Sequence, residues 1–470
     1  MKLYSCILAI LITFFGCKDE LKSDYAYLGG QIINPKNNFV VFLKDEKVLD
    51  TILLDGYNRF IYKIDSLQEG MYTFKHGDEF QMVLLEPQDS IMLRLNTLDF
   101  DESLVYTGVG AKKNNYFTNE FLQNEIEEKK IFKFCQLDPK TYETRIESIR
   151  TKKVNELNAF KAKYPTSKNF DKIAQANIDY NYYFNKEVYP FVHYGKNKIA
   201  ILATMPEGFY SYRSKVNYND DMLKDYFTYK SFLRTNVNNL GLERHSKHSD
   251  EVYLEKNSMC YTLDRLAVID SLIANTAIKN NLLYHYTINA LTRFSDDNAS
   301  ESVLQSYLSK STDKDLNNMV ERYAAAVNRL KVGNRLPEVA VMDYNGKIAN
   351  IVDASKNVTV ISFWSHTNFN HFKDSHKKIK ELRIKYPEVQ FVSVNVDDYD
   401  LETTKKTLER NFIPFTNEYQ VKNSEAAKET LAIFPLTKTI ILDSDQIIVD
   451  SNANIFDKYF EESLLGAINR

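Results

Sequence analysis

Residues 358–371 read VTVISFWSHTNFNH, and this stretch decides the fold of the C-terminal part of the chain. The run from Val358 to Phe363 is almost entirely β-branched or apolar, which predicts a central strand buried on both faces. Between Phe369 and Tyr386, apolar residues return on one side at helical spacing, which predicts a helix. A buried strand is therefore followed by a helix after only a few residues.

The same alternation continues to the end of the chain. A strand, a helix, two strands joined by a turn and a last amphipathic segment are expected in turn, at 389–396, 401–410, 437–442, 447–449 and through Leu464 and Leu465. A strand-helix-strand unit followed by a hairpin and a helix predicts an α/β sheet covered by helices. We assign this domain to residues 333–470.

Two regions of different composition precede this domain. Residues 25–110 contain short apolar runs separated by turn residues, which predicts an antiparallel β-sandwich. Residues 111–332 have few glycines and long charged and apolar segments, which predicts a helical region. Its clearest helix has an apolar stripe from Leu316 to Leu330. The whole chain is thus predicted to be a multidomain α+β protein.

Tyrosines are grouped in the helical region, at Tyr180, Tyr182, Tyr183 and Tyr189. We expect these rings to pack helices together, because a tyrosine combines a large apolar ring with a polar tip. The alternative is a surface that binds carbohydrate or peptide.

The first residues predict export and a lipid anchor. Lys2 precedes an apolar run from Leu3 to Phe15, which is too short to cross a bilayer and is typical of a cleavable signal. The ending Gly16-Cys17 resembles a bacterial lipobox, so residues 1–16 would be a lipoprotein signal peptide, Cys17 the lipidated residue and 17–24 a tether. The alternative is an ordinary signal peptide with an incidental cysteine. The expected location is the cell envelope, lipid-anchored at the outer membrane on its periplasmic or surface face.

Composition excludes several classes of protein. The 470 residues carry 60 Lys+Arg and 63 Asp+Glu, a formal charge of −3, and 44% are hydrophobic. A near-neutral chain lacks the basic balance of a nucleic-acid binder, and its apolar content excludes global disorder. Four cysteines are too few for a disulfide scaffold. No cofactor is expected.

Ordered motifs in the C-terminal domain resemble the TlpA type of thioredoxin-like (redoxin) envelope protein. The resemblance covers 333–470 and rests on the sequences Gly333-Asn334-Arg335-Leu336-Pro337, Asn345-Gly346-Lys347, Phe363-Trp364-Ser365, Tyr386-Pro387, Val394-Asn395-Val396-Asp397 and Phe434-Pro435-Leu436. A β-rich part followed by helices is also similar to the N-terminal portion of envelope lipoproteins that carry such a module. The resemblance implies thiol-disulfide exchange through a C-x-x-C directly after the Phe-Trp strand.

That place is occupied here by Asn368, Phe369, Asn370 and His371. Thiol-disulfide exchange needs an attacking thiolate and a resolving thiol, and no cysteine occurs after Cys260. We therefore assign no catalytic residue and expect a non-catalytic binding or assembly module, anchored to the membrane by its lipid. The alternative is an envelope thiol-disulfide oxidoreductase or peroxide reductase, and a third possibility is a metal- or histidine-dependent enzyme.

A binding groove is expected between Trp364, the four residues 368–371 and the pair Phe434 and Pro435. Pro435 matches the family's cis-proline, which helps to hold an extended peptide, so a peptide or protein partner is expected there. A groove plugged by side chains such as Phe369 is the alternative.

Three histidines cluster in sequence at His366, His371 and His376, but their spacing on a helix points 371 and 376 away from each other. No metal site is therefore predicted. Asn368 is expected to cap the helix, and His371 to be neutral near the helix N-terminus. Cys135 and Cys260 are expected to be either buried thiols or one disulfide.

Overall fold

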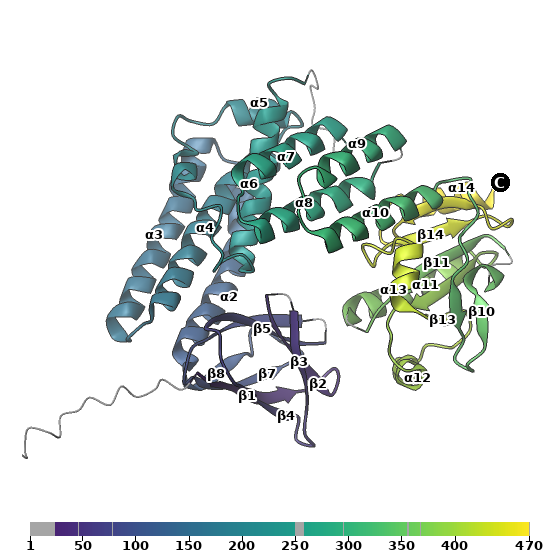
Figure 1. Cartoon of the computed structure of the whole chain (residues 1–470), viewed down its shortest axis with the longest axis horizontal. Helices are drawn as coiled ribbons and strands as arrows, with labels where there is room; N and C mark the ends of the chain where they lie inside the picture. Colours follow the sequence, from purple (N-terminus) through teal and green to yellow (C-terminus); the bar gives the residue numbers. More distant parts are fainter. Residues whose placement is uncertain are drawn as a thin grey trace, which may run out of the picture. The chain divides into compact units, whose positions relative to one another are not determined.

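The computed structural model describes residues 24–45, 47–77, 79–249, 258–294, 296–354, 357–366 and 368–469 (Figure 1). The expected signal peptide, the lipidated Cys17 and all but the last residue of the tether lie outside the described residues. Within the described part, no helix is both long enough and apolar enough to cross a membrane. The described chain forms two compact units, the first ending at Glu127 but including Pro165–Lys172, and the second containing Glu128–Tyr164 and Ile173–Arg470.

The first unit contains two four-stranded sheets that share one hydrophobic core. One sheet has the order β4(Arg59–Ile64), β1(Ala26–Ile33), β7(Ser90–Asn96), β8(Val105–Val109), and the other β3(Lys47–Leu53), β2(Phe39–Lys44), β5(Gly70–His76), β6(Glu79–Leu85). Alternation is clearest in β7, where every second side chain enters the core, whereas β3 at the edge of its sheet has no buried residue.

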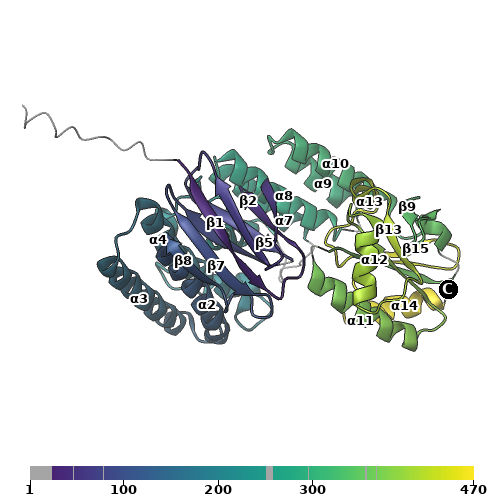
Figure 2. The same cartoon turned by 90° about the horizontal axis from the view of Figure 1, so that it is seen from below.

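One strand pair corrects the prediction of a purely antiparallel sandwich. β1 and β7 run parallel, with Tyr27 opposite Ser90, while the other pairs in these two sheets are antiparallel. Parallel neighbours require a long crossover connection. Residues 34–89 form this connection, because all four strands of the second sheet come after β1 and before β7 in the sequence (Figure 2).

Helices occupy the middle of the chain, as expected. Their bounds are α2(Ala111–Phe134), α3(Pro139–Lys163), α4(Lys168–Val192), α5(Lys198–Ala203), α6(Phe227–His245), α7(Met259–Leu272), α8(Thr276–Leu291), α9(Asp297–Leu308) and α10(Lys314–Arg329), with a 3-10 turn at Ser211–Lys215. The tyrosines pack helices together, since the ring of Tyr180 lies 4.8 Å from that of Tyr229 and the ring of Tyr189 lies 4.5 Å from that of Tyr142.

The C-terminal region of the second unit forms a seven-stranded sheet with helices packed on it (Figure 1). Its order is β10(Ile348–Asn350), β9(Ala340–Met342), β13(Glu418–Val421), β12(Gln390–Asn395), β11(Thr359–Trp364), β14(Thr439–Leu442), β15(Ile448–Ala453). The helices are α11(Phe369–Lys385), α12(Leu401–Arg410), α13(Ser424–Thr430) and α14(Phe460–Ile468), with a 3-10 turn at Ile351–Ala354. β11 is the central strand, and all six of its residues are buried.

The direction of the strands follows the predicted element order. β11 and β12 are parallel and connected through α11, whereas β14 runs antiparallel to β11 and β15 antiparallel to β14. Helix α10 also packs here, because Ala326 and Leu330 belong to the same core cluster as β11 and β12. The C-terminal part of the predicted stripe, with Tyr323, Val327 and Leu330, therefore joins this core.

Candidate functional site

The segment that follows β11 begins α11 with an amide cap. Asn368 precedes the helix, and its side-chain oxygen accepts a hydrogen bond from the backbone N–H of His371 at 3.2 Å. Such a cap satisfies one of the N–H groups that every helix leaves free in its first turn. The structure thus confirms Asn368 as the N-cap, at the first position of the tetrad 368–371.

Asp397 fastens the loop between β11 and this helix. Its buried carboxylate follows β12 and accepts hydrogen bonds from the Ser365 hydroxyl at 2.7 Å and from the backbone N–H of His366 at 2.6 Å. Parallel strands end at the same edge of a sheet, so β12 delivers Asp397 to the point where β11 ends. Ser365 and His366, the two residues directly after β11, are therefore held to the end of β12.

The expected proline loop reaches the same edge of the sheet. β14 is antiparallel to β11 with Thr439 opposite Ser362, so β14 begins where β11 ends. The peptide bond between Phe434 and Pro435 is cis. Phe434 is exposed, whereas Trp364 is buried against Phe372 with its ring centroid 4.7 Å away. Of the expected groove residues, Phe434 thus offers an open surface, whereas Trp364 does not line a groove, because it packs into the core with Phe372.

Lys438 holds the base of the proline loop. Its ammonium group is buried and donates hydrogen bonds to the carbonyls of Leu431 at 2.9 Å and Ala432 at 3.1 Å. Burial lowers the pKa of Lys438 from 10.5 to about 7, and the charge of Asp450 opposes that shift. The lysine therefore ties the start of β14 to the end of α13. Sequence analysis missed this role, because no motif marks a lysine that bonds to carbonyls six and seven positions before it.

Two of the three clustered histidines have separate polar partners. His366 Nε2 lies 3.3 Å from the Thr404 hydroxyl, and His376 Nε2 lies 3.3 Å from a Glu418 carboxylate oxygen. Burial lowers the pKa of His366, against the opposing charge of Asp397.

His371 lies closest to the predicted groove. Burial lowers its pKa, and the neighbouring His376 adds to the effect while Asp374 opposes it. The imidazole is thus biased towards its neutral form, as expected, although burial is the main cause rather than the helix N-terminus. Its Nδ1 is buried without a hydrogen-bond partner in the described structure.

No thiol stands near the tetrad in sequence, and the two cysteines of the described residues, Cys135 and Cys260, do not form a disulfide. Cys135 is buried directly after α2, where burial raises its pKa to about 11, and Cys260 lies in α7. The expected alternative of one disulfide between them is therefore wrong. A thiol with a raised pKa is a poor nucleophile, so Cys135 offers no redox centre.

A small apolar pocket lies beside Phe434. It measures about 160 Å³ and is lined by Tyr284, Ile288, Met319, Tyr323, Ile433 and Phe434, among others. The Tyr323 hydroxyl donates a hydrogen bond to the Phe434 carbonyl at 3.4 Å. Sequence analysis missed this pocket, because its walls come from α8, α10 and the proline loop, which are more than a hundred positions apart at their extremes.

No protein-family model and no curated protein matches the chain. Solved structures resemble part of it. A crystal structure of a proposed thiol-disulfide oxidoreductase from Bacteroides vulgatus is 20% identical over 30% of this chain and 98% of its own, with a TM-score of 0.27. A proposed electron-transfer protein from Aquifex aeolicus is 17% identical over 30% and 100%, with a TM-score of 0.25. A proposed thiol:disulfide interchange protein from Chlorobium tepidum is 17% identical over 30% and 99%, with a TM-score of 0.24.

Proposed function

We propose that the C-terminal domain is a non-catalytic, thioredoxin-like binding module of a lipid-anchored cell-envelope protein. The observation that carries this proposal is the helix start at Asn368, where an amide cap stands at the place of the first redox cysteine. An amide can neither attack a disulfide nor be oxidised to one. The domain contains no cysteine to act instead.

The ligand of this module would be an extended peptide segment with an apolar side chain. The pocket beside Phe434 supports this chemistry, because its volume of about 160 Å³ suits a single aliphatic or aromatic side chain and its lining is mostly apolar and aromatic. Phe434 itself is 42% exposed and belongs to the proline loop. A bound segment would run over this loop and place one side chain in the pocket.

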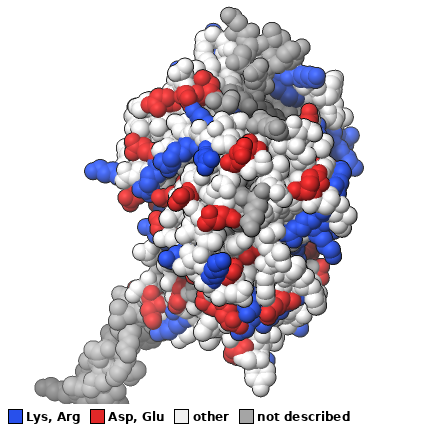
Figure 3. All heavy atoms as spheres, turned by 90° about the vertical axis from the view of Figure 1, so that its right-hand side faces the viewer, with Lys and Arg blue, Asp and Glu red and all other residues white. Residues whose placement is uncertain are grey.

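The charge distribution does not favour an acidic or a basic partner. Acidic and basic side chains are interspersed on the face of the molecule shown in Figure 3. Recognition would therefore rest on backbone hydrogen bonds and apolar burial, as in other modes of extended-peptide binding.

The anchor belongs to the same proposal. A lipid on Cys17 would hold the chain at the outer membrane, on its periplasmic or surface face. Labelling with a radioactive fatty acid in the producing cells would be expected to mark the wild-type protein and to be lost in Cys17→Ser.

Site-specific cross-linking tests the binding surface. A photo-reactive phenylalanine analogue at position 434 is expected to capture a partner in intact envelopes, while the same analogue at Phe412 serves as the control. Phe412 is 95% exposed but does not line the pocket. Equal capture at both positions, or none at 434, would contradict the proposal.

The enzyme alternative has its own test. An envelope thiol-disulfide oxidoreductase would reduce insulin with dithiothreitol well above background. Turnover that persists in the double variant Cys135→Ser/Cys260→Ser would refute the non-catalytic assignment. The described residues of that variant contain no thiol, so the activity would have to come from another group of the protein.

A further inference from the structure

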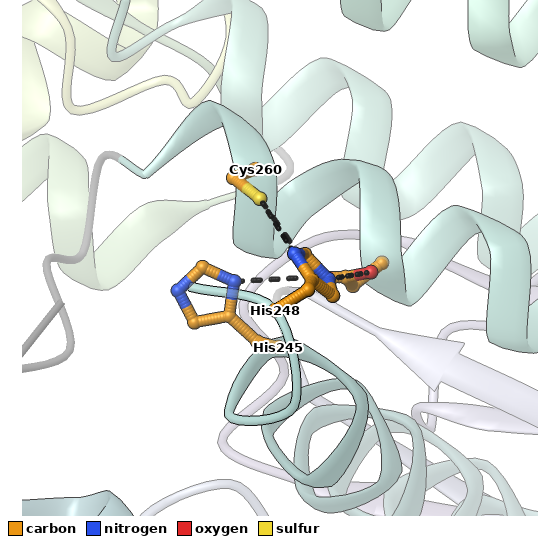
Figure 4. Close-up of side chains that lie close together, drawn as sticks. His245, His248 and Cys260 are labelled. Carbon is orange, nitrogen blue, oxygen red and sulfur yellow. Dashed lines mark hydrogen bonds and ion pairs between the residues drawn. The ribbon is translucent and has the colours of Figure 1, made fainter. Parts of the chain in front are cut away.

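Four side chains that can bind metals converge where α6 ends and α7 begins. His245 is the last residue of α6, His248 lies in the turn after it, and Cys260 and Asp264 lie in the first turns of α7. Each offers one ligand atom, and these four atoms all lie within 4.8 Å of one another. Figure 4 shows the two imidazoles and the thiol gathered around one point.

Three of the six ligand-to-ligand distances lie near the edges of a metal-binding tetrahedron. Asp264 Oδ2 lies 3.1 Å from His245 Nδ1, 2.9 Å from His248 Nε2 and 4.0 Å from Cys260 Sγ. Zinc bonds of about 2.0 to 2.3 Å in tetrahedral geometry give ligand-to-ligand distances of about 3.3 to 3.8 Å. These three distances bracket that range, and the remaining ones, all within 4.8 Å, require the side chains to close by up to about 1 Å around an ion.

The two helices are built to approach closely here. A Cβ atom on Gly241, one turn before His245, would lie 2.5 Å from the Arg265 side chain, next to Asp264. The Tyr261 hydroxyl also donates a hydrogen bond to the Asn238 carbonyl at 2.8 Å, which joins α7 to α6. Cys260 and Asp264 lie on one face of α7, since residues four apart are neighbours on a helix.

We propose that His245, His248, Cys260 and Asp264 bind one Zn²⁺ ion. Two imidazoles, one thiolate and one carboxylate are the donor types that zinc takes in proteins, and the two anionic ligands balance its charge. Arg244 Nε contacts Asp264 Oδ1 at 2.9 Å. Oδ2 is left to bind the metal, while Arg244 orients the carboxylate from outside the first coordination sphere.

A cysteine nucleophile activated by His248 is the competing explanation. His248 Nδ1 lies 3.8 Å from Cys260 Sγ and its Nε2 lies 2.9 Å from Asp264 Oδ2, which is the order of a Cys-His-Asp relay. In a relay, however, the acid stands behind the histidine, away from the sulfur. Here Asp264 Oδ2 is nearly as close to the sulfur as the imidazole is, and His245 contacts the same oxygen. This compact arrangement favours a metal.

Four protein ligands would make a closed site with a structural role. The metal would link the end of α6 to the start of α7 and thereby join the two helices across the loop between them. Because the thiol must lose its proton to bind, uptake of zinc would release protons and weaken at low pH.

Metal binding by the purified full chain tests the proposal. After treatment with a chelator and its removal, the protein is expected to take up one equivalent of Zn²⁺, measured by competition with a chromophoric chelator. Co²⁺ in place of Zn²⁺ is expected to give the charge-transfer band of a cobalt–thiolate bond. Zinc is also expected to raise the melting temperature by several degrees, because a ligand bound only by the folded state stabilises it.

Two variants and one matched control assign the ligands. Cys260→Ser is expected to weaken zinc binding at least about 100-fold and to abolish the charge-transfer band, because a neutral hydroxyl replaces a thiolate. His248→Ala is expected to weaken binding similarly, and since this side chain is 47% exposed the variant should fold. Cys135→Ser, which alters the other cysteine of the described residues, is expected to retain one equivalent.

Three outcomes would overturn the proposal. They are uptake well below one equivalent by the wild type, equal uptake by wild type and Cys260→Ser when both give native circular dichroism, and loss of uptake in Cys135→Ser alone. Rapid alkylation of Cys260 by iodoacetamide in a chain that binds no zinc would instead support the nucleophile.

Discussion

The start of α11 and the junction of α6 with α7 differ in the chemistry that they hold. At the first, a thioredoxin-like chain would have two thiols, and this protein has an amide cap and a neutral-biased imidazole. At the second, one thiol lies with two imidazoles and a carboxylate within 4.8 Å. The comparison teaches that packing and hydrogen bonds can position a loop without any thiol beside it, since Asp397 holds the residues after β11 and Lys438 holds the proline loop.

The largest expected effect comes from restoring thiols at the start of α11. The double variant Asn368→Cys/His371→Cys would place a C-x-x-C at a helix N-terminus, which lowers the pKa of a thiol and makes it reactive. We expect insulin reduction with dithiothreitol to rise roughly ten-fold or more above the wild type.

The single variant Asn368→Cys is the control for that experiment, because it lacks a resolving thiol and should remain near background. A double variant that folds, by circular dichroism, and still shows no activity would mean that the frame around the tetrad does not support redox chemistry.

A second test concerns the buried lysine below the proline loop. Lys438 has a pKa of about 7 in the folded protein and 10.5 when exposed, so between these values the unfolded chain binds the proton that the folded chain has lost. The free energy of unfolding should therefore increase with pH in that window, by up to about 1.4 kcal/mol per pH unit. Lys438→Met should remove this contribution, as measured by urea unfolding at pH 7, 8.5 and 10. Parallel profiles for the two proteins would argue against a depressed pKa.

Next in size is the loss of the carboxylate at the α6–α7 junction. In chelator-treated protein, Asp264→Ala should reduce the free energy of unfolding by about 2 to 3 kcal/mol, because buried His245 loses this acceptor and Arg244 its ion pair. Asp221→Ala, which breaks an exposed ion pair with Lys224, should change it by less than about 1 kcal/mol. Urea unfolding measures both changes. Similar losses of free energy of unfolding in the two variants would show that Asp264 stabilises the protein no more than an exposed carboxylate does.

The smallest effect is expected at the amide cap. Asn368→Ala should reduce the free energy of unfolding by about 1 kcal/mol, and Asn368→Ser should retain most of it, since serine is also a good capping residue. Chemical unfolding that monitors the C-terminal region would measure both. A larger loss in the serine variant than in the alanine variant would contradict the role of a cap.

The sequence alone was sufficient for the central elements of the C-terminal sheet. The apolar run predicted at Val358 to Phe363 became β11, one residue later at each end, and α12 has the predicted bounds of 401–410. Short elements such as β9 and β10 were missed, because three residues are too few to establish a period. The candidate site at 368–371 was also placed from sequence, since it follows the strand directly, but the buried position of Trp364 and the pocket beside Phe434 depend on packing.

The sequence by itself determined that residues 333–470 carry no thiol, because the absence of cysteine is a property of composition that no fold can change. Only the tertiary structure decided which groups meet. His248 and Cys260 are twelve positions apart and belong to different helical segments, so no local spacing brings them together. They meet because α6 and α7 pack closely at Gly241, and the direction of β1 against β7 likewise depends on a crossover of more than fifty residues.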